Sequence, residues 1–325
     1  MGLSRPKILC SACLEHCNCR YDGSVIKNET VEKLKEYVDF VTVCPEMGIG
    51  LPSPREAIRI IKSDDGFKLV DSYKGTDRTP DMEKFIEGFF ENNNQNDFDA
   101  VILKCKSPTC GLKEVKYYAS AGKVPSINKT YGFFGGAIKT NFPNLPTEDD
   151  GRLMHFNIRE HFLMSLFLHF EFRKVVDEVK AIKKISPLVT FHTKNKYLFM
   201  AYHQKALSQM GKIVANHDHL PHAEVLKQYE QAMLPIYSTY PNSGKNTNML
   251  LHLFGYFKNE LSKDEKSFFL DQLEQYQNKK IPFSSVLMII RSWVIRFDEP
   301  YLKSQTIFNM FPSDLIEVTD SGKGL

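Results

Sequence analysis

Short apolar runs alternate with helical patterns over the first 150 residues, and this alternation limits the folds that they can adopt. The predicted strands are residues 7–9, 40–43 and 99–104, and the predicted helices are residues 32–37, 57–62 and 82–91. Strands that alternate with helices are typical of a parallel sheet covered by helices. The sequence therefore predicts an α/β, Rossmann-like domain at the N-terminal end.

The second half of the chain has a different pattern. A stretch of turn and linker composition, residues 142–151, precedes it. Beyond that stretch apolar residues recur at helical spacing in residues 158–185, 197–216, 249–261, 265–278 and 284–297. We therefore expect an α/β domain over residues 1–148, a helical connector over 149–189 and an all-α domain over 190–325.

Length and composition are those of an ordinary globular protein with room for two cores, at 325 residues and 37.4 kDa. No uncharged run reaches the roughly 18–20 residues that a membrane span needs, and no apolar signal region stands at the N-terminus. Free thiols without such a signal indicate a reducing compartment. We expect a cytoplasmic protein without membrane contact, and nothing in the sequence implies a protein partner.

Charge is distributed unevenly between the two halves. Residues 1–150 carry 20 Lys and Arg against 22 Asp and Glu, a net charge of −2, whereas residues 151–325 carry 22 against 17, a net charge of +5. A basic half is compatible with a polyanionic partner, and it is equally compatible with an ordinary solvated surface. Charge alone leaves both interpretations open.

All seven cysteines lie in the first third of the chain, between Cys10 and Cys110. Their odd number argues against a framework of disulfides. Three of them, Cys13, Cys44 and Cys110, each follow a predicted strand by a few residues. Because ligands of parallel sheets bind outside the carboxyl ends of the strands, we expect these thiols to meet at one sheet edge. Thiolates from three separate loops can hold an inorganic cluster there.

A zinc site is an alternative interpretation of the cysteines near the N-terminus. Cys10, Cys13, Cys17 and Cys19 form the pattern C-x2-C-x3-C-x-C. This pattern has one C-x2-C pair, where structural zinc sites commonly have two. Cys10 and Cys105 fall at strand-like positions, where cysteine behaves as a small buried hydrophobe. Spacing alone leaves zinc ligation and inert thiols open.

Four motifs in the first half of the chain resemble the bacterial thiouracil desulfurase family. They are residues 11–14 with 19–23, residues 43–46 with 50–52 and 54–55, residues 75–79, and residues 106–111. Residues 191–202 and 246–258 resemble the helical domain that is fused to this family in two-domain proteins. Nearly the whole chain is therefore similar to the bacterial tRNA 4-thiouridine desulfidases.

In this family three cysteines hold a [4Fe-4S] cluster, and the resemblance implies that they are Cys13, Cys44 and Cys110, with one iron left open. An open coordination position distinguishes a catalytic metal from a structural one. Since soft iron prefers a sulfur ligand, the open iron would bind the thiocarbonyl sulfur of a thiolated uracil. Water would then replace the sulfur at the ring carbon without net redox chemistry.

The resemblance also implies two catalytic side chains. Glu46 aligns with the acid/base carboxylate of the family, which would activate the water or protonate the ring nitrogen. Ser107 aligns with a serine beside the substrate. Without the family, Glu46 would be interpreted as a surface carboxylate and Ser107 as a turn residue.

Polar residues near the expected cluster are candidates for substrate binding. Arg20, Tyr21 and Asp22 either position the substrate or form a salt-bridged turn. Arg55 either anchors a phosphate or carboxylate or caps a helix. His16 stands where the family usually has glycine, and it is either a fourth cluster ligand or a solvated loop residue.

The helical domain carries candidate RNA contacts. They are His192, Lys194, Lys196, Lys245 and Asn248. Lys and Arg supply the phosphate contacts of nucleic-acid-binding proteins. A basic helical domain would hold the folded RNA while the target base is turned out toward the cluster.

The resemblance therefore predicts a hydrolase that removes sulfur from 4-thiouridine in tRNA and releases uridine and sulfide. Two alternatives stay open. A salvage desulfurase would act on free thiouracil or thiouridine, for which no RNA-binding domain is needed. A non-catalytic iron–sulfur RNA-binding sensor would have its cluster completed by a fourth ligand such as His16 or Cys17.

Overall fold

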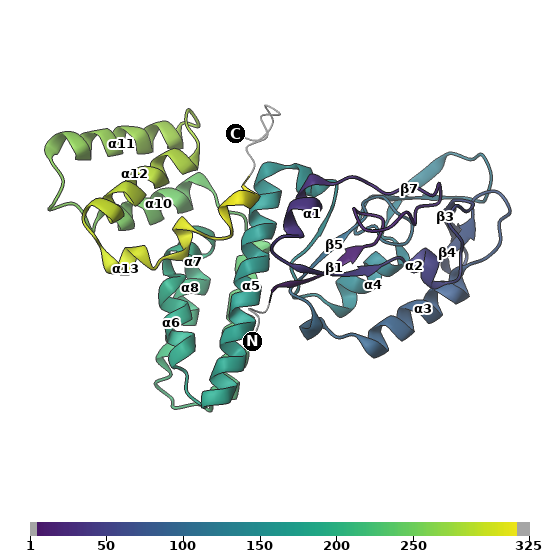
Figure 1. Cartoon of the computed structure of the whole chain (residues 1–325), viewed down its shortest axis with the longest axis horizontal. Helices are drawn as coiled ribbons and strands as arrows, with labels where there is room; N and C mark the ends of the chain where they lie inside the picture. The colour runs from purple at the N-terminus through teal and green to yellow at the C-terminus, as the bar shows by residue number, and fades with distance from the viewer. Residues whose placement is uncertain (1–4, 317–325) are drawn as a thin grey trace. The chain divides into compact units, whose positions relative to one another are not determined.

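The computed structural model describes residues 5–316 of the chain. These residues divide into two compact units, one of residues 5–166 together with 314–316, and one of residues 167–313. The division falls inside helix α5 (Phe156–Ile182) (Figure 1). The predicted domain limits at 148/149 and 189/190 stay predictions, and the last nine residues of the predicted all-α domain lie outside the described residues.

Four parallel strands form the main sheet of the first unit, in the order β2-β1-β5-β8. They are β1 (Lys7–Ser11), β2 (Asp39–Val43), β5 (Ala100–Leu103) and β8 (Thr147–Asp149). The predicted parallel sheet is confirmed. The prediction of a linker over 142–151 is wrong at β8, which is a strand. It was missed because it has only three residues and its polar sequence carries no apolar strand signal.

A second sheet, which the sequence analysis did not predict, is mixed and has the order β4-β3-β6-β7. Its strands are β3 (Ile58–Ser63), β4 (Gly66–Asp71), β6 (Val115–Tyr118) and β7 (Ser126–Thr130). The predicted helix over 57–62 is wrong, because this segment is strand β3. Ile58 and Ile60 are buried while Arg59 between them is partly exposed, which is the alternation of a strand.

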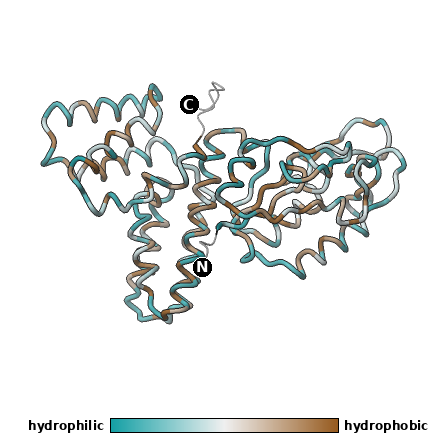
Figure 2. Tube along the Cα trace, viewed as in Figure 1, coloured by the Kyte–Doolittle hydropathy of each residue, from teal (hydrophilic) through white to brown (hydrophobic). Residues whose placement is uncertain are grey.

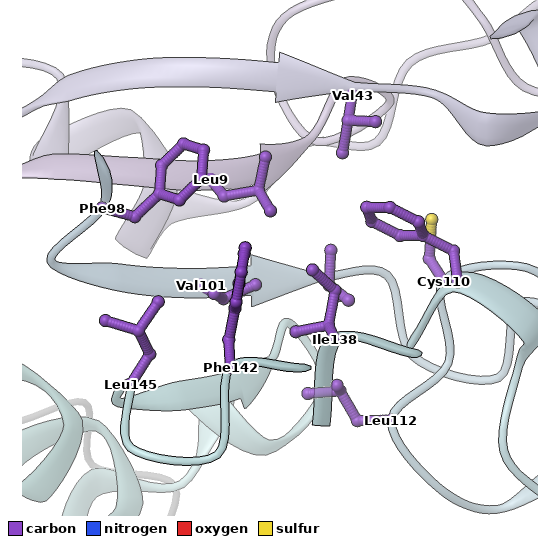
Figure 3. Close-up of a cluster of buried hydrophobic side chains, with 11 residues drawn as sticks. Leu9, Val43, Phe98, Val101, Cys110, Leu112, Ile138, Phe142 and Leu145 are labelled. Atoms are coloured by element: carbon purple, nitrogen blue, oxygen red, sulfur yellow. The ribbon is translucent and has the colours of Figure 1, made fainter. Parts of the chain in front are cut away.

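Helices cover the parallel sheet of the first unit. They are α1 (Glu29–Leu34), α2 (Pro45–Gly48), α3 (Thr79–Asn92) and α4 (Phe133–Asn141), with short 3-10 helices η1 (Gln95–Asp97) and η2 (Arg152–Met154). Helices α3 and α4 pack on the same face of the sheet (Figure 1). Figure 3 shows Leu9 and Val101 of the strands in one apolar cluster with Ile138 of α4 and with Cys110. Cys110 therefore rests on the main core.

Helices account for the regular structure of the second unit. They are α6 (Ser186–Lys194), α7 (Lys196–Tyr202), α8 (Gln204–Ala215), α9 (His222–Ser238), α10 (Ser243–Phe254), α11 (Lys263–Gln277), α12 (Phe283–Arg296) and α13 (Pro300–Lys303), followed by η3 (Thr306–Phe308). The short helix η4 (Ser313–Leu315) lies at the division, with two of its three residues in the first unit. The predicted all-α character is confirmed. The helical stretch predicted over 197–216 is two helices, since His203 caps the start of α8 through its Nδ1, which accepts from the Ala206 N–H at 3.1 Å.

Hydrophobic residues follow the central strands of the first unit, as Figure 2 shows, and the same strands are buried. In the described part of the chain, residues 5–316, no helix combines the length and the apolar composition needed to cross a membrane.

Helix α4 begins against the loop that carries Cys110. Gly132 donates its N–H to the Gly111 carbonyl at 2.8 Å, and Gly135 donates to the Thr109 carbonyl at 2.9 Å. A Cβ atom on Gly135 would lie 2.5 Å from the Cys110 carbonyl oxygen. Glycine is required here because the helix and the loop touch backbone to backbone.

Replacing Gly135 with alanine is expected to destabilise the first unit by about 1–3 kcal/mol, because the clash is with backbone that no side-chain rotation can relieve. For a unit of this size the melting temperature should fall by roughly 2–4 °C per kcal/mol. Gly88→Ala on α3, where an added Cβ meets nothing within 4 Å, is the matched control and should be neutral or stabilising. Calorimetry checks both variants. A Gly135→Ala protein that melts at or above the wild-type temperature would contradict this account of the α4 contact.

Candidate functional site

A cavity of about 240 Å³ lies at the carboxyl edge of the parallel sheet. Cys13 follows the end of β1 by two residues, Cys44 directly follows β2, and Cys110 lies in the loop after β5. All three line the cavity. Because β2, β1 and β5 are neighbours and run parallel, their carboxyl ends bring the three loops together.

Most of the other predicted site residues also line this cavity. They are Glu46, Ser107, Arg20, Tyr21 and Arg55. Asp22 is not among the lining residues: its carboxylate accepts from the Ser24 hydroxyl at 2.6 Å and pairs with Arg20 at 3.1 Å. Of the two interpretations of Asp22, substrate positioning and a salt-bridged turn, the structure has the salt-bridged turn.

The thiols at the cavity are buried close to one another. Burial raises the pKa of Cys110 to about 12. Burial, and then the neighbouring Cys110, Cys19 and Cys44 thiols, raise the pKa of Cys13. Three thiolates are costly to bury together unless positive charge lies among them. The donor set is therefore suited to a cationic metal centre.

The sulfur atoms of the three cavity cysteines are not grouped as tightly as the ligands of a single metal ion. Zinc–sulfur bonds of about 2.3 Å would bring the thiolates of a single zinc within about 4 Å of one another. Among the described residues, the set whose donor atoms all lie within 4.8 Å of one another is Cys105, Asp149 and Asp150, and the three cavity cysteines do not form such a set. A wider arrangement is what a cluster of several irons requires.

Within the set of Cys105, Asp149 and Asp150, the Lys104 ammonium supplies the positive charge. The Lys104 ammonium lies 2.8 Å from Asp150 Oδ2 and 3.1 Å from Cys105 Sγ. The Cys105 N–H also donates to Asp150 Oδ1 at 2.6 Å. This set is therefore an ion pair that anchors the loop. The predicted strand position of Cys105 is wrong, because the residue lies beyond the end of β5, is half-buried and lines the cavity.

Glu46 is fixed by Arg55. Helix α2 begins directly after Cys44, and this places Glu46 in its first turn. Arg55 Nε and Nη2 both donate to Glu46 Oε2, at 2.8 and 2.6 Å, and Nη2 also donates to the Cys19 carbonyl at 2.9 Å. Both side chains are largely buried, with 4% of Arg55 and 14% of Glu46 exposed. Arg55 therefore anchors a carboxylate of the protein itself, and it caps no helix.

Ser107 and Thr109 connect the Cys110 loop to Glu46. The Ser107 hydroxyl oxygen accepts from the backbone N–H groups of Thr109 and Cys110, at 3.2 and 3.1 Å. Its hydroxyl lies 3.0 Å from Thr109 Oγ1, which in turn donates to Glu46 Oε1 at 3.2 Å. Thr109 is buried and was missed by the sequence analysis, although its place between Ser107 and Cys110 was a usable signal.

Lys104 was also missed, and Cys19 was considered only as a zinc ligand or an inert thiol, but both line the cavity. Cys19 is buried, and its carbonyl oxygen lies 3.9 Å from Cys44 Sγ. Cys17, which the sequence analysis treated like Cys19, is exposed. His16 is not a lining residue, and its imidazole packs 4.8 Å from the ring of Phe40. Cys19, and not His16, is therefore an additional thiol or imidazole donor at the cavity.

Two of the predicted RNA contacts are engaged within the helical unit. His192 Nδ1 lies 3.1 Å from the Tyr229 hydroxyl, and burial, followed by the Lys196 ammonium, lowers the pKa of His192. Its imidazole therefore carries little positive charge at neutral pH. Lys245 donates to the Tyr202 carbonyl at 2.8 Å, at the end of α7.

The other predicted RNA contacts are more accessible. Lys194 is exposed at the end of α6 and lines a second cavity of about 650 Å³ in this unit. Lys196 is half-buried, with its ammonium 5.6 Å from the centre of the Tyr197 ring. Asn248 is half-buried on α10. All five contacts stay predictions.

Comparison with known proteins identifies the first unit. Residues 8–150 match a family model described as 2-thiouracil desulfurase. The uncharacterized protein YbbK of Bacillus subtilis (strain 168) is 35% identical over 112 residues, which are 32% of this chain and 72% of that protein. The chain belongs to the 2-thiouracil desulfurase family. The predicted family is thus confirmed, and the three cysteine loops lie within the matched residues of this enzyme family.

Further similarities accompany the 2-thiouracil desulfurase match. Residues 196–312 match a family described as a protein of unknown function (DUF1722). The uncharacterized protein YbgA of Escherichia coli (strain K12) is 26% identical over 136 residues, 42% of this chain and 80% of that protein. Among solved structures, the [4Fe-4S]-dependent thiouracil desulfidase TudS aligns with a TM-score of 0.37 and 23% identity, over 46% of this chain and 94% of that chain.

Proposed function

We propose that this member of the 2-thiouracil desulfurase family removes sulfur from 4-thiouridine in tRNA, with a [4Fe-4S] cluster held by Cys13, Cys44 and Cys110. One observation carries the proposal. The three thiols come from three loops at the carboxyl edge of one parallel sheet, and they line a single cavity together with Glu46. The reaction consumes one water and exchanges the C=S of the base for C=O, so that one sulfide leaves.

The residues present fit a cluster with three protein ligands. The three sulfur atoms do not all lie within 4.8 Å of one another, Cys110 is buried in the apolar core, and Cys13 and Cys44 are half-buried at the cavity. When bound, such a cluster would supply a soft Lewis-acidic iron that accepts a thiocarbonyl sulfur. Cys19 lines the same cavity, and in this proposal it stays a neighbour of the ligands rather than a ligand.

Glu46 would handle the protons of the exchange. Arg55 holds its Oε2 with two hydrogen bonds, so the carboxylate keeps one orientation. Its Oε1 is the oxygen that Thr109 contacts, and this oxygen would take a proton from the attacking water and pass it to the departing sulfide. Ser107 shapes the Cys110 loop through its two backbone contacts and lines the cavity beside the substrate position.

The choice of tRNA as substrate rests on the helical half of the chain. Residues 151–325 carry a net charge of +5, and Lys194 is exposed within them. A free base would need only the cavity of the first unit, whereas a folded RNA needs an extended basic surface. Lys194, Lys196 and Asn248 are the main proposed contacts, because His192 and Lys245 are hydrogen-bonded within the protein and would contribute less.

The test uses the full chain, reconstituted anaerobically with iron and sulfide. It is incubated with tRNA that contains 4-thiouridine and, separately, with free 4-thiouracil and 4-thiouridine. We expect equal amounts of uridine and sulfide from the tRNA, with kcat/KM higher than for the free compounds. Mass spectrometry of nucleosides and a colorimetric sulfide assay provide the measurements. A reconstituted protein that carries iron and releases no sulfide would sink the proposal and favour an RNA-binding sensor.

A salvage activity on free thiouracil is the second candidate. The description of the matched family favours it, since that description names a free base. Higher kcat/KM for 4-thiouracil than for thiolated tRNA would select this candidate.

A further inference from the structure

A second cavity in the first unit adjoins the cysteine cavity. It has a volume of about 460 Å³ and lies over the mixed sheet, whose strands β3, β4 and β7 are labelled in Figure 1. Lys106 and Pro108 line both cavities. This groove, lined by Arg59, Lys106, Lys116, Tyr118 and Lys129 among others, is here called the lysine groove. Its position makes it an approach to the proposed reaction site.

The lysine groove is strongly basic within a unit that is acidic overall. Four cationic side chains line it, and Glu114 is the one carboxylate among the lining residues. The local sequence has the same bias, because residues 101–147 contain seven lysines and Glu114 as their one acidic residue. The net charge of −2 over residues 1–150 conceals this basic segment.

Two of the lysines stand opposite each other in the sheet. Lys116 of β6 and Lys129 of β7 are direct partners in the antiparallel register, so their side chains share one face. Like charges in directly opposed positions destabilise a sheet. Glu114 pairs with Lys129 at 2.9 Å, at an exposed position where such a pair contributes little. An anionic ligand over this face would remove the repulsion.

The same face carries a stacked cation and ring. The guanidinium carbon of Arg59 lies 4.3 Å from the centre of the Tyr118 ring, and Arg59 Nη1 donates to the Gly122 carbonyl at 2.6 Å. Arg59 is therefore held over the ring of Tyr118, which stands two residues after Lys116 in β6. Arginine planes and aromatic rings are the surfaces on which unpaired bases stack.

We propose that the lysine groove binds the sugar–phosphate backbone of the RNA strand next to the thiolated base. Lys116 and Lys129 contact phosphates, the Arg59–Tyr118 pair stacks with a neighbouring base, and the target base passes Lys106 and Pro108 into the cysteine cavity. The inference rests on the proposed function for the identity of the target base. It adds an RNA-contacting surface in the first unit, independent of the predicted contacts in the helical unit.

The test removes the two opposed lysines together, as Lys116→Gln with Lys129→Gln. Binding of unmodified tRNA to the full chain is measured by fluorescence anisotropy over a range of salt concentrations. We expect affinity to fall about tenfold near 0.1 M salt, and the slope of log K against log salt to fall by about 2, or about 1 for each lost phosphate contact. Lys84→Gln, at an exposed lysine of α3 outside the groove, is the matched control and should bind like the wild type.

The outcomes separate this inference from the proposed function, because binding of unmodified tRNA needs no chemistry. Thermal melting checks that the double variant folds, and loss of the opposed charges should leave its stability unchanged or raised. An unchanged affinity and salt slope in the folded variant would overturn the inference. The inference would also be overturned if the double variant bound tRNA normally but no longer bound phosphatidylserine vesicles, since the groove would then be a membrane contact. Weaker tRNA binding in a protein that releases no sulfide would leave the groove standing and overturn the proposed function.

Discussion

Alanine at Cys13, Cys44 or Cys110 is expected to abolish cluster retention and sulfide release, with activity lower by at least about 10³-fold. Each thiol comes from a different loop at the carboxyl edge of the sheet, so the loss of any one removes the proposed ligand of that loop. Removal of a directly bound ligand should exceed the 10–100-fold effects typical of residues that only support a metal ligand. Iron content per chain and visible absorbance after anaerobic reconstitution measure retention, and the sulfide assay measures activity.

Cys17→Ala is the matched control, because Cys17 belongs to the same loop as Cys13 and its side chain is exposed. This variant should keep its iron and most of its activity. Cys19→Ala should also keep much of both, although Cys19 lines the cavity. A Cys110→Ala protein with full iron content would contradict the proposed ligand set. Loss of iron in Cys19→Ala to the same extent as in Cys44→Ala would move Cys19 into that set.

Glu46→Gln should lower kcat by about 10²–10⁴-fold, the usual contribution of a general acid–base group. Glutamine keeps the size of the side chain and its contact with Thr109, but it cannot take a proton from water. Single-turnover sulfide release from thiolated tRNA gives the rate. Iron content and melting temperature are measured in parallel, because the substitution also leaves the buried Arg55 guanidinium without its carboxylate.

Two further variants separate chemistry from structure at this position. Glu46→Asp keeps the charge on a shorter side chain and should recover part of the lost rate. Glu36→Gln, at an exposed carboxylate after α1, should behave like the wild type. A Glu46→Gln protein that keeps its iron and turns over at the wild-type rate would remove Glu46 from the mechanism.

Strands buried in the parallel sheet were predictable from the sequence, and the mixed sheet was not. The segments that became β1 and β5 contain buried apolar runs, because both faces of these central strands are covered. The edge strand β2 is more exposed, and its valines and phenylalanine still indicated a strand. Strand β3 has isoleucines at 58, 60 and 61, which satisfy helical and strand spacing over so short a segment. Strand β8 has no apolar signal at all, and it exists because β5 supplies hydrogen-bonding partners from far away in the chain.

In the site, the residue types were predictable and their partners were not. The positions of Cys13, Cys44 and Cys110 after strands were sufficient to place them at one sheet edge. The interaction of Arg55 with Glu46 was not predictable. The sequence analysis considered Arg55 only as an anchor for a bound phosphate or carboxylate or as a helix cap. Thr109 and Lys104 were missed because a hydroxyl or an ammonium in a loop has no meaning until its partner is known.

The sequence by itself determined the family, the α/β and helical halves of the chain and the position of three cysteines after strands, because these depend on local patterns and on motifs of fixed spacing. The tertiary structure alone decided that Arg55 fixes Glu46, that Cys19 lines the cavity while His16 does not, and that a lysine groove adjoins the cysteines. Hydrogen bonds, burial and charge density are properties of distances between residues far apart in the chain, and one-dimensional spacing does not contain those distances.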